Sequence, residues 1–102
     1  MSTAETMMSL SYEKRRFVEL LSHYPFAVEF WDFSNGRGAL DTKSLEECFG
    51  SLSGGEKQVL AFLANLWLCR NHFEFDFVEA WNTLTPNHWE PIANWFARPF
   101  TC

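Results

Sequence analysis

The sequence predicts an all-α fold: a single compact domain of five to six short helices packed around a central apolar helix at about residues 54–70. Three observations lead to this prediction. Apolar residues recur at helical spacing, and caps and prolines mark the ends of these segments. Residues 59–68 are apolar nearly all round, as in a helix covered on most sides. A chain of 102 residues is long enough for one domain with its own core.

A flexible N-terminus is expected over residues 1–10, which are polar and rich in methionine, ahead of a single helical domain over residues 11–102. The first helix begins with Ser11 as its N-cap, because apolar residues then recur at helical spacings while charged residues take the other faces. Pro25 ends this helix. Its apolar positions are Leu10, Phe17, Leu21 and Tyr24.

Residues 26–33, FAVEFWDF, are compatible with a strand or with a helix. A strand would place Asp32 and Glu29 among apolar side chains, so that neither face would be clean. A helix leaves these two acidic residues together on one polar edge, and Pro25 suits a first helical position. A helix is therefore favoured, followed by a turn over residues 34–38.

Three more helices are expected towards the C-terminus besides the central one. The first spans residues 42–49, with Asp41 or Thr42 as its cap. The second opens at Asp76, which has capping-box spacing to Glu79. The last begins at residues 85–86 or at Asn87, and the later start is preferred because Pro91 then lies nearer the beginning of the helix. In the helix that opens at Asp76, one side carries Phe77, Ala80, Trp81 and Leu84. In the last helix, the side expected to be buried carries Trp89, Ile92, Ala93 and Phe96, and Trp95 and His88 lie outside that side.

The stretch LSGGEK, residues 52–57, resembles the signature loop of ABC-type ATPases, which in that family offers a helix N-terminus to a nucleotide phosphate. Such an ATPase also needs a GxxxxGK[ST] loop, which the sequence lacks. The same residues have capping-box spacing: Ser53 would accept from the Glu56 amide, and Glu56 would reach back to the Ser53 amide. We therefore expect a helix start here, with Gly54 and Gly55 allowing close approach of a neighbouring helix.

No metal site, cofactor or catalytic group is expected. Cys69 and His72 have a ligand-like spacing, with His88 as a third candidate, but structural zinc normally takes four ligands in paired clusters. No nucleophile and base are paired by any recognisable motif. The sequence is therefore interpreted as that of a non-enzyme.

The composition favours a protein partner. The net charge of −5 argues against a broad phosphate-binding surface and thus against direct nucleic-acid binding. Aromatic residues make up 18% of the chain, and some of them are expected to reach the surface, where a partner would cover them. No Lys or Arg lies between Arg70 and Arg98, whereas Glu74, Asp76, Glu79 and Glu90 do. An acidic and aromatic region of this kind fits a basic protein surface, or one that handles nucleic acid.

A cytoplasmic location is expected. The three cysteines are widely spaced and form no CxxC pair, which argues against a disulfide framework. The N-terminus lacks the pattern of a secretory signal, and the longest apolar run, residues 59–69, is too short to span a bilayer.

These observations together favour a small acidic, non-enzymatic protein-binding module, acting as an inhibitor, adaptor or regulator of a larger intracellular complex. The profile loosely resembles the small anti-defence and regulatory proteins of phages and mobile elements. One alternative is a structural subunit that self-associates through surplus aromatic residues, and another is a nucleotide-binding protein related to ABC-type ATPases. The residues expected to bind the partner are Glu74, Glu79, His88, Glu90 and Trp95, with Glu29, Trp31 and Asp32 as a second patch.

Overall fold

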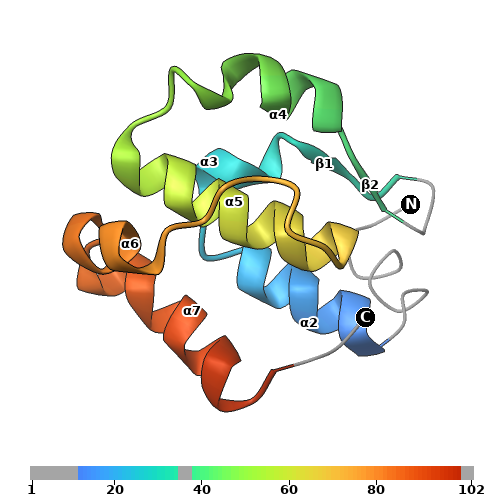
Figure 1. Cartoon of the computed structure of the whole chain (residues 1–102). Helices are drawn as coiled ribbons and strands as arrows, with labels where there is room; N and C mark the ends of the chain where they lie inside the picture. The colour runs from blue at the N-terminus through green and yellow to red at the C-terminus, as the bar shows by residue number, and fades with distance from the viewer. Residues whose placement is uncertain (1–11, 35–37, 100–102) are drawn as a thin grey trace.

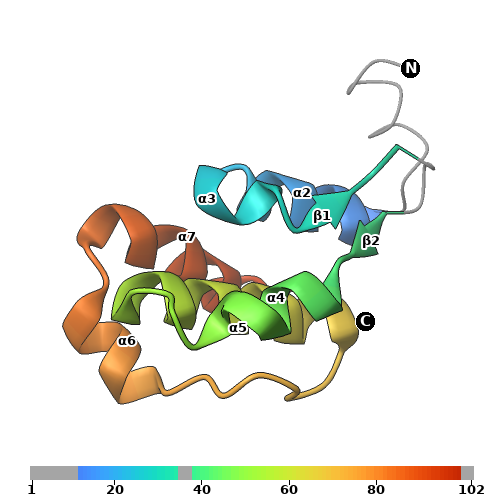
Figure 2. The ribbon, with the colours of Figure 1, turned by 90° about the horizontal axis from the view of Figure 1, so that it is seen from above.

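Six helices and a two-stranded sheet make up the part of the chain that the computed structural model describes, residues 12–34 and 38–99 (Figure 1). Helix α5 lies in the middle, with α4 along one side and α2 and α7 along the other (Figures 1 and 2). This arrangement confirms the all-α prediction, while residues 1–10 and the Ser11 cap lie outside the described residues. The elements are α2 (Tyr12–Leu21), α3 (Pro25–Val28), β1 (Trp31–Asp32), β2 (Ala39–Leu40), α4 (Thr42–Phe49), α5 (Gly54–Leu68), α6 (Phe77–Thr83) and α7 (Pro86–Ala97).

Helix α5 forms the centre of the hydrophobic core, as its apolar run predicts. Every residue from position 58 to position 64 is buried, so no side of this stretch faces solvent. Leu60 and Leu63 are completely buried, and each full burial of a Leu side chain is worth about 2 kcal/mol. The helix ends at Leu68, slightly earlier than expected, because Cys69 takes the left-handed conformation with φ 58°.

Residues 26–33 divide between a helix and a strand. The helix expected here forms only over Pro25–Val28, with Pro25 in its first turn. The prediction is wrong for Trp31 and Asp32, which form β1 and pair in antiparallel register with Leu40 and Ala39. The reason is tertiary, because the strand places the Trp31 ring in the core, where it is only 6% exposed, and leaves Asp32 in solvent.

Gly38, directly before β2, packs against the aromatic core, while residues 35–37 of the expected turn lie outside the described residues. Gly38 has a φ of 83°, a conformation that side chains rarely adopt. A Cβ atom on this residue would lie 2.7 Å from ring atoms of Phe33 and Trp67. Glycine is therefore required here for both its conformation and its size.

Side-chain caps begin three of the helices at the residues that the sequence indicates. The carboxylate of Asp41 and the hydroxyl of Ser53 accept from the amide three residues on, at 3.1 Å and 3.3 Å. Asp76 does the same for the Glu79 amide at 3.0 Å. One detail differs from the expected capping box, since the Glu56 carboxylate accepts from the Ser53 hydroxyl at 2.9 Å rather than from the Ser53 amide.

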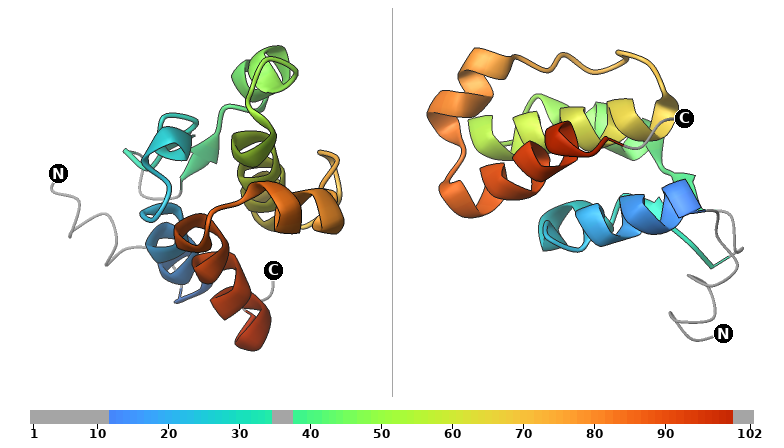
Figure 3. Two further views of the ribbon diagram at one scale, coloured as in Figure 1. Left: turned by 90° about the vertical axis from the view of Figure 1, so that its left-hand side faces the viewer. Right: turned by 90° about the horizontal axis from the view of Figure 1, so that it is seen from below.

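The segment between α5 and α6 runs back along α5 and is held there by two polar side chains (Figures 1 and 3). The Asn65 side-chain oxygen accepts from the amides of His72 and Phe73, both at 2.9 Å, and its Nδ2 donates to the Phe73 carbonyl at 2.8 Å. Gln58, which is 2% exposed, accepts from the Asp76 amide at 2.8 Å. These contacts decide where α6 begins.

Helix α7 starts earlier than the preferred prediction. Thr85 is its N-cap and Pro86 occupies the first turn, so the expected start at Asn87 is wrong. The expected buried side is only partly right: Ile92 is completely buried and Trp89 half-buried, whereas Ala93 and Phe96 are exposed. The side facing the core instead carries His88, Ile92 and Trp95, at helical spacings of four and three.

Two further observations bear on the expected location. Cys69 is disulfide-bonded, although the wide spacing of the cysteines did not indicate a disulfide. Cys48 has a free thiol. Within residues 12–34 and 38–99, no helix combines the length and the apolar character needed to cross a bilayer. The cytoplasmic location stays a prediction.

Candidate protein-interaction surface

Four aromatic side chains of α6 and α7 form a continuous array, which we call the α6–α7 aromatic face: Phe77, Trp81, Trp89 and Phe96. The ring of Phe77 lies 5.5 Å from that of Trp89 and 6.3 Å from that of Phe96, centroid to centroid. Trp81 meets Trp89 edge to face at 5.6 Å. The array therefore joins the two helices through rings that touch in favourable geometry.

Three of the four rings are exposed. Phe77, Trp81 and Phe96 are 54%, 64% and 48% exposed. Among the described aromatic residues, Tyr12 is the only other one with comparable exposure. Isolated apolar side chains are common on protein surfaces, but contiguous exposed apolar area marks interaction sites. Within the part of the chain that the structure describes, the exposed aromatic area is thus concentrated at α6 and α7.

Contacts with buried residues of the core fix the position of the α6–α7 aromatic face. Ala80 is completely buried and lets α6 lie close to α5. The buried ring of Phe62 on α5 supports Phe96 at a centroid distance of 5.7 Å. The end of α6 also packs against the start of α5, where a Cβ on Gly55 would lie 3.5 Å from Leu84. That distance is ordinary van der Waals contact, so the two glycines at the start of α5 are not required for the approach.

The acidic residues near the face divide into two kinds. Glu79 lies against the start of α5, with its Oε1 3.7 Å from the position of a Cβ on Gly54, and a carboxylate there is favoured by the helix dipole. Asp76 caps α6. Glu74 and Glu90 are exposed, and no described contact gives either of them such a structural role. These two residues are therefore the better candidates for contact with a partner.

A groove continues from the face between the returning segment and the end of α7. Its volume is about 950 Å³, and Phe96, Trp95 and Glu74 contribute to its lining. Trp95 is half-buried and packs edge to face on Phe62 at 5.3 Å. Two of the expected site residues, Glu74 and Trp95, therefore share this groove.

His88 does not join them. Its half-buried ring lies 5.7 Å from the ring of Tyr24 and 5.7 Å from that of Phe26, on the side of α7 that faces the core. The Tyr24 hydroxyl donates to the His88 carbonyl at 2.5 Å, and burial raises the pKa of this tyrosine above its usual range. We therefore assign His88 to packing.

The expected second patch is not a surface cluster. Trp31 is buried and packs against Phe17 at 5.4 Å, so its ring is not accessible to a partner. Asp32 is exposed, and hydrogen bonds from the Ser34 hydroxyl and amide lower the pKa of its carboxyl. These hydrogen bonds give Asp32 a local role in holding Ser34 directly after β1, which leaves only Glu29 of this patch as an exposed side chain without a described function.

The site expected from the sequence missed Phe77, Trp81 and Phe96. The helical spacing of Phe77 and Trp81 places them on one face, but their apolar character suggested a buried face. What the spacing does not reveal is that α7 covers this face only partly, with Trp89. Surplus aromatic content was the one signal pointing to exposed rings, and it does not say which rings they are.

The residues considered for metal and nucleotide binding make other contacts in the structure. Residues 12–34 and 38–99 contain no group of three or more His, Cys, Asp or Glu side chains placed to hold a metal ion. His72 instead contacts the Glu46 carboxylate at 2.6 Å, and Cys69 is disulfide-bonded. At the start of α5, the nearby Glu79 carboxylate would repel a phosphate.

Comparison of the chain with protein-family models, with curated proteins and with solved structures finds no match.

Proposed function

We propose that this chain is a non-enzymatic protein-binding module that engages a basic protein surface through the α6–α7 aromatic face. The observation that carries the proposal is the concentration of exposed aromatic area there, with Phe77, Trp81 and Phe96 each about half exposed or more. Trp and other aromatic residues are the side chains that most often anchor protein interfaces. As a binding module, the chain would act as an inhibitor, adaptor or regulator of a larger complex.

Charge complementarity supports a basic partner. Between Arg70 and Arg98 the chain carries four acidic residues and no Lys or Arg, and the whole of α6 and α7 lies within this interval. A Lys or Arg side chain of the partner would be attracted by Glu74 and Glu90 and would find aromatic faces for cation–π contact. The same charges disfavour a nucleic acid as the direct ligand.

The test is affinity capture from the native host with two matched variants. Trp81→Ala removes the most exposed ring of the face, and Tyr12→Ala removes a ring of similar exposure on α2. We expect the captured partner to be retained by the wild type and by Tyr12→Ala. With the purified partner, Trp81→Ala should weaken the Kd at least about ten-fold, as expected for an aromatic anchor. Equal binding by all three proteins would overturn the proposal.

Self-association is a separate outcome of the same variants. Light scattering at high micromolar concentration measures the molar mass of the wild type and of Trp81→Ala. A wild-type dimer that dissociates in the Trp81→Ala variant would show that a second copy covers the face, and the alternative of a self-associating structural subunit would then replace the proposal. A monomer in both cases leaves the face available to another protein.

A further inference from the structure

The cysteines of this chain are in two different states. The sequence contains three of them, Cys48, Cys69 and Cys102. Cys69 directly follows α5 and is disulfide-bonded, whereas Cys48 on α4 has a free thiol that donates to the Leu45 carbonyl at 3.6 Å. Cys102 lies outside the described residues. Because a disulfide needs two cysteines, a bond within one chain leaves Cys102 as the partner of Cys69.

The position of Cys69 agrees with a partner that follows α7 in the sequence. Helices α5 and α7 run in the same direction, so their C-terminal ends lie on the same side of the molecule (Figures 1 and 3). Cys69 lines the same groove as Phe96, which is in the last turn of α7. Cys102 is three residues beyond Pro99, where the described part of the chain ends, and three residues reach at most about 10 Å. A bond between Cys69 and Cys102 therefore ties the end of α7 to the end of α5.

The backbone at Cys69 takes a conformation that favours glycine. Among residues 12–34 and 38–99, Cys69 is the one non-glycine residue with a positive φ, 58°. A helix end in this left-handed conformation usually takes glycine, because a Cβ atom is disfavoured there. A cysteine is thus locally unfavourable at this position, and the disulfide gives its side chain a role there. The residue is exposed, so a thiol reductant can reach the bond.

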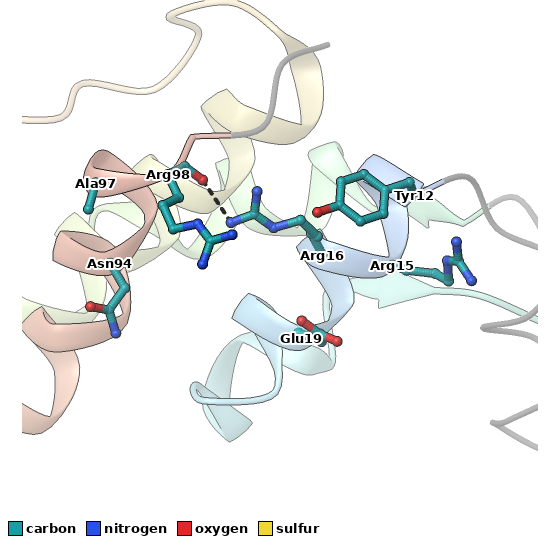
Figure 4. A pocket seen from close by; sticks show the side chains of 7 residues that line it. All are labelled: Tyr12, Arg15, Arg16, Glu19, Asn94, Ala97 and Arg98. Carbon is teal, nitrogen blue, oxygen red and sulfur yellow. Dashed lines mark hydrogen bonds between the residues drawn. The ribbon is translucent and has the colours of Figure 1, made fainter.

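The loop closed by such a bond contains the α6–α7 aromatic face. It runs over residues 70–101 and includes all of α6 and α7. The middle of α7 is anchored by Ile92, which is completely buried. Directly after α7, the Arg98 carbonyl accepts from the Arg16 guanidinium of α2 at 2.7 Å, in a hydrogen bond between exposed residues (Figure 4). The disulfide adds a covalent attachment of this end to the central helix α5.

We propose that Cys69 and Cys102 form a redox-reversible clasp that fixes the end of α7, and with it the ring of Phe96, beside α5. Closing the clasp forms one S–S bond and breaks two S–H bonds. The two protons and two electrons pass to a disulfide oxidant such as oxidised glutathione, which becomes two thiols. A dithiol reductant reverses the step and is itself oxidised to a disulfide. In the reduced chain, the end of α7 keeps its noncovalent contacts but loses the covalent limit on its movement.

The first test maps the bond in the full chain. The protein is equilibrated with oxidised glutathione, and the remaining thiols are alkylated with N-ethylmaleimide in denaturant. Trypsin cleaves after Lys57 and Arg70, so mass spectrometry of the unreduced digest should find peptide 58–70 linked to peptide 71–102. Three alkylated thiols, a glutathione adduct on Cys69, a link to Cys48, or a link between two chains would overturn the proposal.

The second test measures what the clasp does to the fold. Reduction of the wild type with dithiothreitol should lower its Tm by at least about 10 °C, because the closed loop restricts the unfolded chain. Hydrogen exchange at the amides of residues 93–98 should accelerate as well. This comparison of the wild type with itself does not require that any variant folds. It also uses no binding partner, so its outcome does not depend on the function proposed for the α6–α7 aromatic face.

Serine variants assign the effect to individual cysteines. Cys69→Ser and Cys102→Ser should each melt like the reduced wild type and should not respond to dithiothreitol. Cys48→Ser is the matched control, because it removes the free thiol and should keep the full response. An equal Tm for the oxidised and reduced wild type, unchanged exchange at residues 93–98, or an undiminished response in Cys102→Ser would contradict the clasp.

Discussion

Asn65 shows how one polar side chain positions the surface of this molecule. It interrupts the apolar run of α5, yet it makes three hydrogen bonds to the segment that returns along the helix. Without them the amide of Phe73, which lies at a buried position, would lose its partner. A buried amide left without a hydrogen-bond partner costs about 1–3 kcal/mol. Asn65 therefore contributes more to the free energy of unfolding than an asparagine on the solvent-exposed surface.

We predict that Asn65→Ala lowers the free energy of unfolding by about 2 kcal/mol, because it removes these hydrogen bonds. Urea denaturation measures the change. Amide hydrogen exchange should also accelerate at residues 72–76, the part of the chain that Asn65 and Gln58 hold.

The matched control is Asn71→Ala, at an exposed position of the same segment. It should change stability by less than about 0.5 kcal/mol, as is usual for surface substitutions. A comparable loss of stability in both variants would contradict the role assigned to Asn65.

At the scale of elements, the helices are short and depend on their caps and their packing. Helix α6 has seven residues, and isolated helices of that length are not stable in water. It forms because Asp76 caps it, Gln58 holds the cap residue and Ala80 packs into the core. Phe77 and Trp81 stay exposed because α7 covers their side of this short helix only partly, with Trp89.

The start of α5 allows a direct test of the capping interpretation of LSGGEK. Ser53→Ala should lower the free energy of unfolding by about 1 kcal/mol, the usual value of an N-cap. ATP should bind neither the wild type nor the variant, because the serine only caps the helix and Glu79 lies beside the helix start.

The comparison variant for that test is Ser51→Ala, whose hydroxyl donates to the Cys48 carbonyl outside any cap position. A smaller loss than that of Ser53→Ala is expected, and chemical denaturation measures both. Saturable ATP binding to the wild type that Ser53→Ala abolishes would revive the resemblance to ABC-type ATPases as a statement about function.

At the scale of the whole molecule, charge is distributed unevenly. Three of the basic residues, Arg15, Arg16 and Arg98, lie near the junction of α2 and the end of α7. Helices α6 and α7 hold acidic residues and no Lys or Arg.

We predict that reversing the charges of Glu74 and Glu90 together, Glu74→Lys with Glu90→Lys, weakens binding of the captured partner about five-fold at low salt. The reason is the loss of attraction for the basic surface of the partner, so the dependence of the Kd on ionic strength should fall as well. Binding isotherms at several salt concentrations measure both effects. Glu79 is left unchanged because its carboxylate also serves the start of α5.

Two single variants define the specificity of that effect. Glu29→Lys tests the second patch expected from the sequence, and Glu47→Lys reverses an exposed charge on α4. Neither should change the Kd by more than experimental error. If Glu29→Lys weakened binding as much as the double variant, the partner would contact the region of α3 and β1 instead.

Local chemistry made the helix starts predictable. Asp41, Ser53 and Asp76 form their caps within a few residues of the chain, so sequence spacing alone locates them. The apolar run of α5 predicted the centre of the core for a similar reason, because a helix without a polar side has to be covered.

The remaining features depended on contacts between segments that are distant in the sequence. Trp31 lies in a strand because that conformation buries its ring in the core. This packing overrides the helical pattern of the residues around it. Arg98 joins Arg16 only through the packing of α7 on α2.

The sequence by itself determined the helical class, the central helix, the caps and the surplus of aromatic and acidic residues. Only the tertiary structure decided which aromatic rings stay exposed: Phe77, Trp81 and Phe96 are exposed, whereas Trp31 is buried. The physical reason is that periodicity states which side chains share a face, whereas burial depends on how much of that face a neighbouring element covers. In this chain α7 covers α6 incompletely, and the aromatic face results from that geometry.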